Sequence, residues 1–233
     1  MSSVAIMQPY FLPYIGYFQL ISAVDKFIIF DDVSYINRGW INRNRILLAG
    51  QSDMVTLPLN NASQNKAICE LSLVSAPLWR RKLLRKVEEA YSKAPHRQEV
   101  CVLLESILQF GSDDLSAFLV NSIILVNRSI GISTPLVHSS RVYENSQLKG
   151  ESRIIDICLI ENATDYLNPI GGTSLYEKHV FAEKQISLKF LDSAPREYKQ
   201  YGNDHVPWLS ILDVMMFNGF EGTHKMLGEF RLK

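Results

Sequence analysis

Short apolar runs alternate with polar or proline-containing segments at the start of the chain. Ser3–Met7 is a small, β-branched run typical of a strand, and it leads into residues 8–13, where two prolines prevent a helix or a central strand from continuing. Apolar residues then recur at helical spacing over residues 14–23. Residues 26–30 are a continuous apolar run bounded by charge, typical of a parallel strand buried on both faces. The pattern predicts a strand, a shaped loop, a helix and a second strand.

The middle of the chain changes from strand-like to helical character. Residues 34–45 form a polar segment rich in amide and guanidinium groups, and two strand-like runs follow at residues 46–48 and 54–57, with turn-forming residues 50–53 between them. Residues 68–74 alternate apolar and polar positions, which predicts one more strand. Three amphipathic helices are predicted next, with Asp113 or Asp114 as the N-cap of the third, over residues 77–91, 100–110 and 115–130.

Strands and helices alternate again after residue 130. Strands are predicted at residues 134–137, 165–168 and 186–191, and helices at residues 153–160 and 207–217. No internal repeat, low-complexity stretch or long linker interrupts the pattern. We therefore predict one α/β domain over residues 1–233, with a mainly parallel, Rossmann-like sheet and a helical section inserted at about residues 77–130.

Composition narrows the class of protein. The 233 residues include 24 Lys+Arg and 24 Asp+Glu, and 47% are hydrophobic, which excludes disorder, collagen and coiled coil. A formal net charge of zero argues against non-specific binding to DNA or to an anionic membrane. The three cysteines lack the spacing of a disulfide framework or a metal site, and no signal peptide or membrane span is evident. We expect a cytoplasmic protein without membrane insertion.

The loop after the first strand is the first candidate site. Ligands of open α/β sheets bind at the carboxyl ends of strands, and Gln8 and Tyr10 supply polar groups there. The alternative is that the two prolines only stiffen a turn and the aromatic side chains belong to the core.

Asp31 and Asp32 form a second candidate site with the arginine-rich residues 38–45. Two carboxylates at a strand end can bind a metal, hold a sugar hydroxyl or accept a proton, and three guanidinium groups suit a diphosphate. Because successive side chains point to opposite faces, only one aspartate is expected to face a pocket. The alternative is an internal loop in which the arginines neutralise the aspartates. RNA binding is disfavoured because the cluster is short and the chain has no net charge.

Two later segments supply further candidates. Gly171 and Gly172 precede a Thr-Ser pair whose N–H groups can face an anion, although no dinucleotide or Walker-type glycine pattern is present. Tyr198 and Gln200 lead towards Asp213, for which helix capping is an equal explanation. No histidine falls in a metal-binding pattern, so surface or hydrogen-bonded roles are expected for His96, His138, His179, His205 and His224.

Taken in order, these segments resemble the WbqC-like family along nearly the whole chain. The resemblance rests on residues 6–18 (IMQPYFLPYIGYF), 31–33 (DDV), 38–45 (RGWINRNR), Tyr176 after the glycine pair, 198–200 and 209–219. Many members resemble His-Gln-Pro where this chain has Met7, so a histidine base is not carried over to that position. The first strands also faintly resemble the nucleotidyltransferase superfamily that includes pantothenate synthetase, whose histidine motif is absent here. ATP use is thus an analogy at the level of fold.

Members of the family are often encoded in O-antigen and surface-polysaccharide gene clusters, and some are labelled glycine transferases. The resemblance implies a transferase that adds an aminoacyl, glycyl or other acyl group to the amino group of a nucleotide-linked amino sugar. The donor would be activated with ATP or carried on tRNA or a carrier protein. The alternative is a non-catalytic nucleotide-sugar-binding or scaffolding protein of a polysaccharide pathway.

In the transferase interpretation, Asp31 or Asp32 takes the proton from the attacking amine, and no metal is required. The expected substrate-binding residues are Gln8, Tyr10, Tyr35, Arg38, Trp40, Asn42, Arg43, Arg45, Gly171, Gly172, Tyr176, Tyr198, Gln200 and Asp213.

Overall fold

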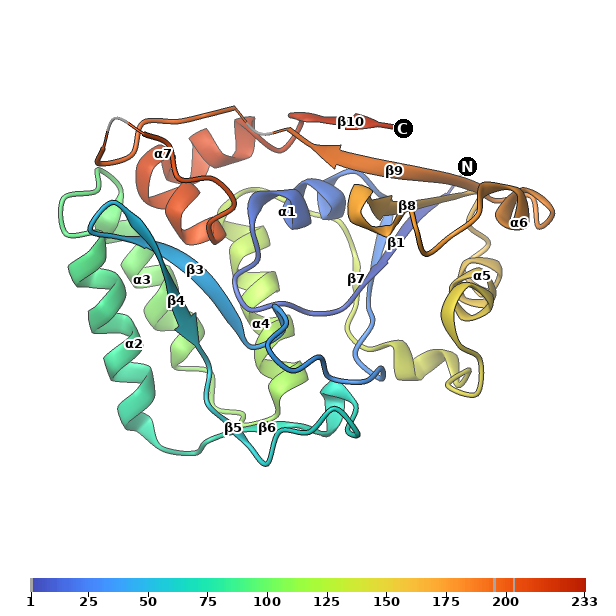
Figure 1. Cartoon of the computed structure of the whole chain (residues 1–233), viewed down its shortest axis with the longest axis horizontal. Coiled ribbons are helices and arrows are strands. Elements are labelled where there is room, and N and C mark those ends of the chain that lie inside the picture. The colour runs from blue at the N-terminus through green and yellow to red at the C-terminus, as the bar shows by residue number, and fades with distance from the viewer. Residues whose placement is uncertain (1, 195, 203) are drawn as a thin grey trace.

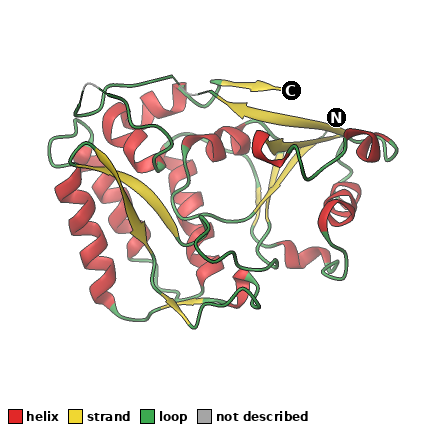
Figure 2. Cartoon of the chain, in the orientation of Figure 1, coloured by secondary structure: helices red, strands yellow, loops and turns green. Residues whose placement is uncertain are grey.

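A computed structural model describes residues 2–194, 196–202 and 204–233, and within them a six-stranded sheet forms the centre of the molecule (Figures 1 and 2). The strand order is β10-β9-β8-β1-β2-β7. All neighbours are parallel except β10, which is antiparallel to β9. The strands are β1 (Ser3–Met7), β2 (Lys26–Ile29), β7 (Leu136–Val137), β8 (Asp165–Pro169), β9 (Ser187–Ser193) and β10 (Phe230–Leu232). The predicted α/β fold with a mainly parallel sheet is confirmed.

The order of the parallel strands is that of a doubly wound sheet. The chain runs from β1 to β2 and β7 on one side, and then returns to place β8 and β9 on the other side of β1. Strand order therefore reverses between β1 and β8, the position at which ligands usually bind to open α/β sheets. The segments that follow these strands carry Gln8, Asp31, Ser139 and Gly171 at the carboxyl edge of the sheet.

Helices cover both faces of the sheet, because the alternation of side chains along each strand presents apolar residues to both (Figure 1). Ala5 of β1 packs in a cluster with residues of α1, α3, α4 and α7. Val4 and Ile6 belong to a second cluster with residues of α5 and α6. The helices are α1 (Ile15–Ser22), α2 (Pro77–Ala90), α3 (Arg97–Leu108), α4 (Leu115–Ser129), α5 (Gly150–Ile160), α6 (Lys178–Ala182) and α7 (Ile211–Lys225), with short 3-10 turns η1 (Ile68–Glu70), η2 (Ser140–Tyr143) and η3 (Ile170–Gly172).

The insertion between β2 and β7 begins with strands and ends with helices. Helices α2 to α4 match the predicted helical section, and the side chain of Asp114 caps α4 by accepting the N–H of Ala117 at 2.7 Å. A hairpin of β3 (Arg43–Leu48) and β4 (Gln51–Thr56) precedes them, with a second small pair of β5 (Leu59–Asn60) and β6 (Ser72–Leu73). The hairpin turn is Ala49-Gly50, with φ of 50° and 77°, so the predicted turn over residues 50–53 was placed too late.

Two predicted elements have different boundaries. Residues 68–74 are a 3-10 turn followed by β6 rather than one strand, because the Glu70 carboxylate accepts the N–H of Ala67 at 2.7 Å and closes the turn. The helix predicted at residues 207–217 begins only at Ile211, where the Ser210 side chain caps it. It continues to Lys225 across a break at Gly219, which has a φ of 68° and lies against the ring of His96.

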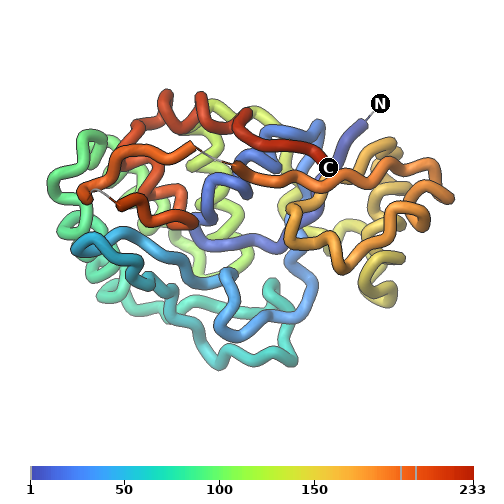
Figure 3. Tube along the Cα trace, turned by 45° about the horizontal axis from the view of Figure 1, so that its top comes forward, coloured from blue at the N-terminus to red at the C-terminus, as the bar shows by residue number. Residues whose placement is uncertain are grey.

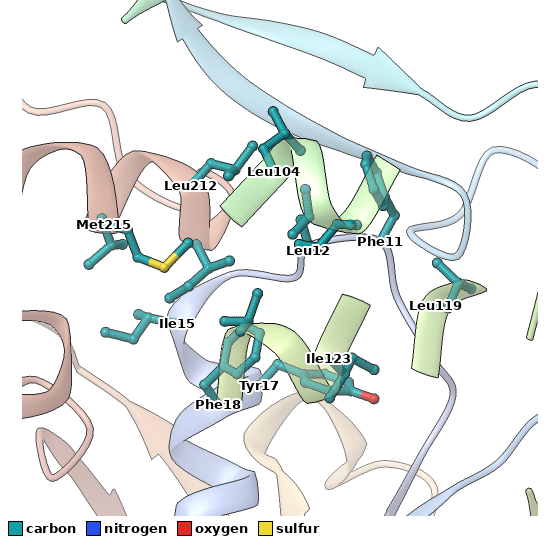
Figure 4. Close-up of a cluster of buried hydrophobic side chains, with 14 of the residues drawn as sticks. Phe11, Leu12, Ile15, Tyr17, Phe18, Leu104, Leu119, Ile123, Leu212 and Met215 are labelled. Atoms are coloured by element: carbon teal, nitrogen blue, oxygen red, sulfur yellow. The ribbon is translucent and has the colours of Figure 1, made fainter. Parts of the chain in front are cut away.

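The apolar half of the N-terminal motif lies in the core. Figure 4 shows Phe11, Leu12 and Phe18 packed among side chains of α3, α4 and α7, so the structural alternative for these motif residues is confirmed. The two chain ends lie close together at one end of the sheet (Figures 1 and 3). None of the helices in the described part of the chain combines the length and the apolarity needed to cross a membrane.

Candidate functional site

Three segments distant in sequence are joined by hydrogen bonds around the N-terminal loop. The Asn44 side chain of β3 donates to the carbonyls of Phe11 and Leu12, at 3.1 and 2.8 Å. The Ser210 hydroxyl also donates to the Leu12 carbonyl, at 2.7 Å, and the Ser210 N–H donates to the carbonyl of Arg45 at 2.8 Å. The loop after β1, the strand β3 and the start of α7 are therefore held in one arrangement.

Two adjoining cavities open where these segments meet. The first, of about 180 Å³, is lined by Tyr10, Pro13, Tyr14, Trp40, Asn44, Arg45 and Trp208. The second, of about 220 Å³, shares Tyr14 and Trp208 with the first and is also bordered by Tyr198 and His205. We call the two cavities together the Tyr14–Trp208 groove. The wall of the first cavity is mainly aromatic, and burial raises the pKa of Tyr10 and Tyr14, so both hydroxyls remain protonated near neutral pH.

Arg45 is the cation of the first cavity. Its guanidinium carbon lies 5.3 Å from the ring centroid of Trp40, and one terminal nitrogen donates to the Trp208 carbonyl at 3.1 Å. The Nε atom of Arg45 is buried and has no hydrogen-bond partner among the described residues. The other terminal nitrogen makes no hydrogen bond among the described residues and is not buried, so an anionic ligand in the cavity can accept its N–H groups.

Trp208 has an unusual conformation for an aromatic residue. Its φ is 60°, in the left-handed region, and the residue is 56% exposed. Its ring packs edge-on against that of Tyr14, with 5.8 Å between the ring centroids. A left-handed conformation costs a residue with a side chain about 1–2 kcal/mol. Exposure of a large aromatic ring on a strained backbone at a cavity is typical of a binding site.

The other two arginines of the motif do not join Arg45. Arg43 donates through its Nε to the carbonyl of Gly39 at 2.9 Å and through a second nitrogen to the carbonyl of Arg38. Arg38 itself is exposed, with a φ of 58°. The three guanidinium groups therefore do not converge on one anion, and only Arg45 lines the groove.

Tyr35 and Asn42 form a buried pair within the same motif. The Tyr35 hydroxyl donates to the Asn42 side-chain oxygen, and the Asn42 amide donates to the carbonyl of Leu57, both at 2.8 Å. Their bonds join the loop after β2 to the end of the hairpin, so both residues hold in place the segment between them, which includes Trp40.

Asp31 and Asp32 point to different partners, and neither lines the Tyr14–Trp208 groove. The Asp31 carboxylate accepts the hydroxyls of Ser116 and Ser139 at 2.6 and 2.7 Å. Asp31 is buried but lines a separate cavity of about 380 Å³, whose lining does not include Asp32, as expected for side chains that point to opposite faces. Asp32 forms an ion pair with Arg153 at 2.5 Å in which both side chains are nearly buried. The arginines of residues 38–45 therefore do not neutralise the aspartates, which instead join β2 and β7 to α4 and α5.

Tyr198, Gln200 and Asp213 come together behind the second cavity. The fully buried Asp213 carboxylate accepts the Tyr198 hydroxyl at 2.6 Å, the Gln200 amide at 2.7 Å and the Tyr91 hydroxyl at 2.9 Å. Burial raises the pKa of Asp213, and these hydrogen bonds oppose that rise. Sequence reasoning missed Tyr91 and His205, because they lie outside the motif segments and fit no metal-ligand spacing.

The remaining candidates lie at the strand-order reversal between β1 and β8. Gln8 is half-buried, and within the described residues its side-chain amide makes no hydrogen bond, although its carbonyl accepts the Tyr17 hydroxyl at 3.0 Å. Gly171 and Gly172 form η3, and a Cβ on Gly172 would lie 2.0 Å from the Asn168 side-chain oxygen. Tyr176 packs edge-on against Tyr166 behind this turn. None of the three sequence-predicted residues Gln8, Gly171 and Tyr176 lines the groove in the described structure.

Comparison with known proteins identifies a family and a relative of the chain. Residues 8–225 match the WbqC-like protein family, so every segment of the groove falls within the matched region. The chain is 33% identical over 223 residues to the uncharacterized protein Rv1507c of Mycobacterium tuberculosis, and the alignment covers 95% of this chain and 96% of that relative. No solved structure matches the chain.

Proposed function

We propose, from the premise that this chain belongs to the WbqC-like protein family, that it is a transferase of surface-polysaccharide synthesis. It would add an aminoacyl group, such as glycyl, or another acyl group to the amino group of a nucleotide-linked amino sugar. Family membership points to work related to polysaccharides. The acceptor and the transfer step are the proposal.

The observation that supports this function is a cation set into an aromatic groove. Aromatic faces stack on nucleobases at about 1–3 kcal/mol per base, and a guanidinium pairs with phosphate oxygens through charge-assisted hydrogen bonds. Arg45 offers such a group beside Trp40, and Trp208 and Tyr14 border both cavities. A nucleotide-linked sugar consists of a base, a diphosphate and a sugar in linear order. Its base can stack on the aromatic side chains, its diphosphate can pair with Arg45, and its length suits two adjoining cavities.

The parts of the substrate can be assigned to the groove by their chemistry. Arg45 would hold the diphosphate, while Tyr10, Tyr14 and Trp40 would contact the base or sugar rings. The sugar would pass Trp208 into the second cavity, where Tyr198 and His205 lie. Asp31 is enclosed by serine hydroxyls away from this path, so the proposal no longer requires it as the base.

The test is a transfer reaction followed by mass spectrometry. The full chain is incubated with UDP- and dTDP-linked amino sugars and an acyl donor in three arms: amino acid with ATP, aminoacyl-tRNA, and an acyl thioester. The expected product is the nucleotide sugar heavier by one acyl group, in an amount greatly reduced by Arg45→Ala. Arg81→Ala, an exposed arginine of α2, is the matched control and should leave the product unchanged.

Two results would contradict the proposal. Nucleotide-sugar binding with no acylated product in any arm would favour the alternative of a non-catalytic binding or scaffolding protein. Transfer that is unaffected by Arg45→Ala would place the site elsewhere in the chain.

A further inference from the structure

His205 borders the second cavity of the groove, on the loop between β9 and α7. The residue is half-buried, and its Nδ1 atom is buried without a hydrogen-bond partner among the described residues. The imidazole packs edge-on against the ring of Tyr198, with 4.9 Å between the ring centroids. The Nε2 atom makes no hydrogen bond among the described residues either, and it is not buried, so this is the nitrogen that can exchange a proton with a ligand.

The loop that carries His205 is held in place by hydrogen bonds to the buried Asp213 carboxylate. Gln200 donates through its amide to Asp213 at 2.7 Å, and its side-chain oxygen accepts the N–H of Val206 at 2.8 Å. Tyr198, at the start of the same loop, donates its hydroxyl to the same oxygen of Asp213, Oδ2, at 2.6 Å. Gln200 is therefore a positioning residue, because it connects the neighbour of His205 to a buried carboxylate.

Several charged and titratable groups lie near His205. Asp213 receives only neutral donors and has no Lys or Arg ion pair among the described residues, while the positive charge of His205 lowers the pKa of Asp213. The other titratable groups on the cavity wall are Tyr14, Glu197 and Arg196, and Arg196 is paired with Glu229 at 3.2 Å. Asp204 precedes His205 and is exposed.

We propose that His205 is the general base of the transfer reaction in the Tyr14–Trp208 groove, an inference that rests on the function proposed above. The amino nitrogen of the sugar attacks the carbonyl carbon of an activated acyl ester or thioester, and a C–N bond forms. The nitrogen loses its proton to His205, and the bond from the acyl carbon to the oxygen or sulfur leaving group breaks. His205 then returns the proton to that leaving group, so the products are an amide and an alcohol or thiol.

Other groups near the groove fit this role less well. Burial and the nearby Asp213 carboxylate raise the pKa of Tyr198, which therefore stays protonated and donates to Asp213. Asp31 lines a different cavity, beside Ser116 and Ser139, and Asp32 is paired with Arg153. His205 combines a free nitrogen with a position on the cavity wall.

The experiment compares the pH dependence of transfer by the wild type, His205→Gln and His179→Gln. His179 is exposed on α6, so its variant is the matched control. The expected result for His205→Gln is a turnover lower by about 100-fold or more, with loss of the acidic limb of the pH–rate profile. Its affinity for UDP or dTDP should remain within about threefold of the wild-type value, because binding in the first cavity is retained.

A second variant keeps the test valid if His205→Gln folds poorly. His205→Ala leaves a space the size of the imidazole, so imidazole added to the buffer should restore part of the lost turnover. Wild-type turnover in His205→Gln, or a loss of turnover matched by an equal loss of nucleotide affinity, would overturn the role of His205 while leaving the transferase function intact. Absence of any product from the wild type would overturn both proposals.

Discussion

Arg45 holds its guanidinium over the indole of Trp40, with 5.3 Å between the guanidinium carbon and the ring centroid. Such a contact contributes about 0.5–2 kcal/mol, depending on how far the cation is removed from water. The same strand places Arg43 two residues earlier, where its nitrogens bind loop carbonyls instead. The two arginines of this motif therefore have different roles: Arg45 lines a cavity, and Arg43 stabilises the loop.

This difference predicts that substitution of Arg45 lowers ligand affinity, whereas substitution of Arg43 lowers stability. Arg45→Ala should weaken the affinity for UDP or dTDP by about 1.5–3 kcal/mol, the range for a hydrogen bond to a charged group. Arg43→Ala should leave affinity nearly unchanged and lower the free energy of unfolding by about 1 kcal/mol, because loop carbonyls lose their donors. Calorimetric titration and urea denaturation measure the two quantities. Equal losses of affinity in both variants would show that Arg43 also binds the phosphates, which contradicts this prediction.

Trp208 offers a test that separates ligand binding from backbone strain. Trp208→Ala and Trp208→Gly both remove the exposed ring, so both should weaken nucleotide affinity by about 1–3 kcal/mol through lost stacking. Only glycine relieves the left-handed conformation, so Trp208→Gly should be more stable than Trp208→Ala by about 1 kcal/mol. Affinity and the urea midpoint are measured for both. An unchanged affinity would show that the exposed ring does not contact the nucleotide.

Asp31 and Asp32 are predicted to contribute to the stability of the fold and not to turnover. Asp32→Asn leaves the nearly buried Arg153 without its counter-charge, which should cost about 3–5 kcal/mol of unfolding free energy. Asp31→Asn weakens charge-assisted bonds from two serine hydroxyls and should cost about 1.5–3 kcal/mol. Turnover per folded molecule should be retained. A stable Asp32→Asn protein with no turnover would contradict this prediction and would indicate that Asp32 is the general base.

The buried carboxylate of Asp213 predicts a dependence of stability on pH. Burial raises its pKa above the ordinary value of 3.8, so the folded state binds the proton more tightly than the unfolded chain does. The resulting stabilisation is present in full below the unfolded pKa and is lost as the pH rises through the folded pKa. The penalty of Asp213→Asn in urea should therefore be larger at about pH 4 than at about pH 7. A penalty that grows with pH would mean that hydrogen bonds to the ionised carboxylate outweigh its burial.

Much of the sheet could be predicted from local pattern. The apolar run at β2 and the proline-terminated run at β1 identify buried parallel strands, and helical periodicity located α2 to α4 within a few residues. One element boundary was placed wrongly because tertiary contacts decide it. The start of α7 depends on the Ser210 cap and on bonds to Pro13 and Arg45, which no local pattern reveals.

The candidate site was predicted only in part. The motif segments around Tyr10 and Arg45 meet in the groove, and Tyr198, Gln200 and Asp213 form one network. Sequence spacing could not show that serines from α4 and η2 enclose Asp31, since those partners are at least 85 residues away. His205 was missed for the same reason, because its significance depends on the cavity and not on neighbours in the chain.

The location of a bound nucleotide sugar decides between the groove and the usual ligand position of this fold. A crystal structure of the full chain with a UDP- or dTDP-linked amino sugar should place the diphosphate within hydrogen-bonding distance of Arg45 and a ring against Trp208, with the sugar amino group facing His205. A nucleotide bound instead between the carboxyl ends of β1 and β8, against Gln8 and Gly171, with the Tyr14–Trp208 groove empty, would contradict the proposed site.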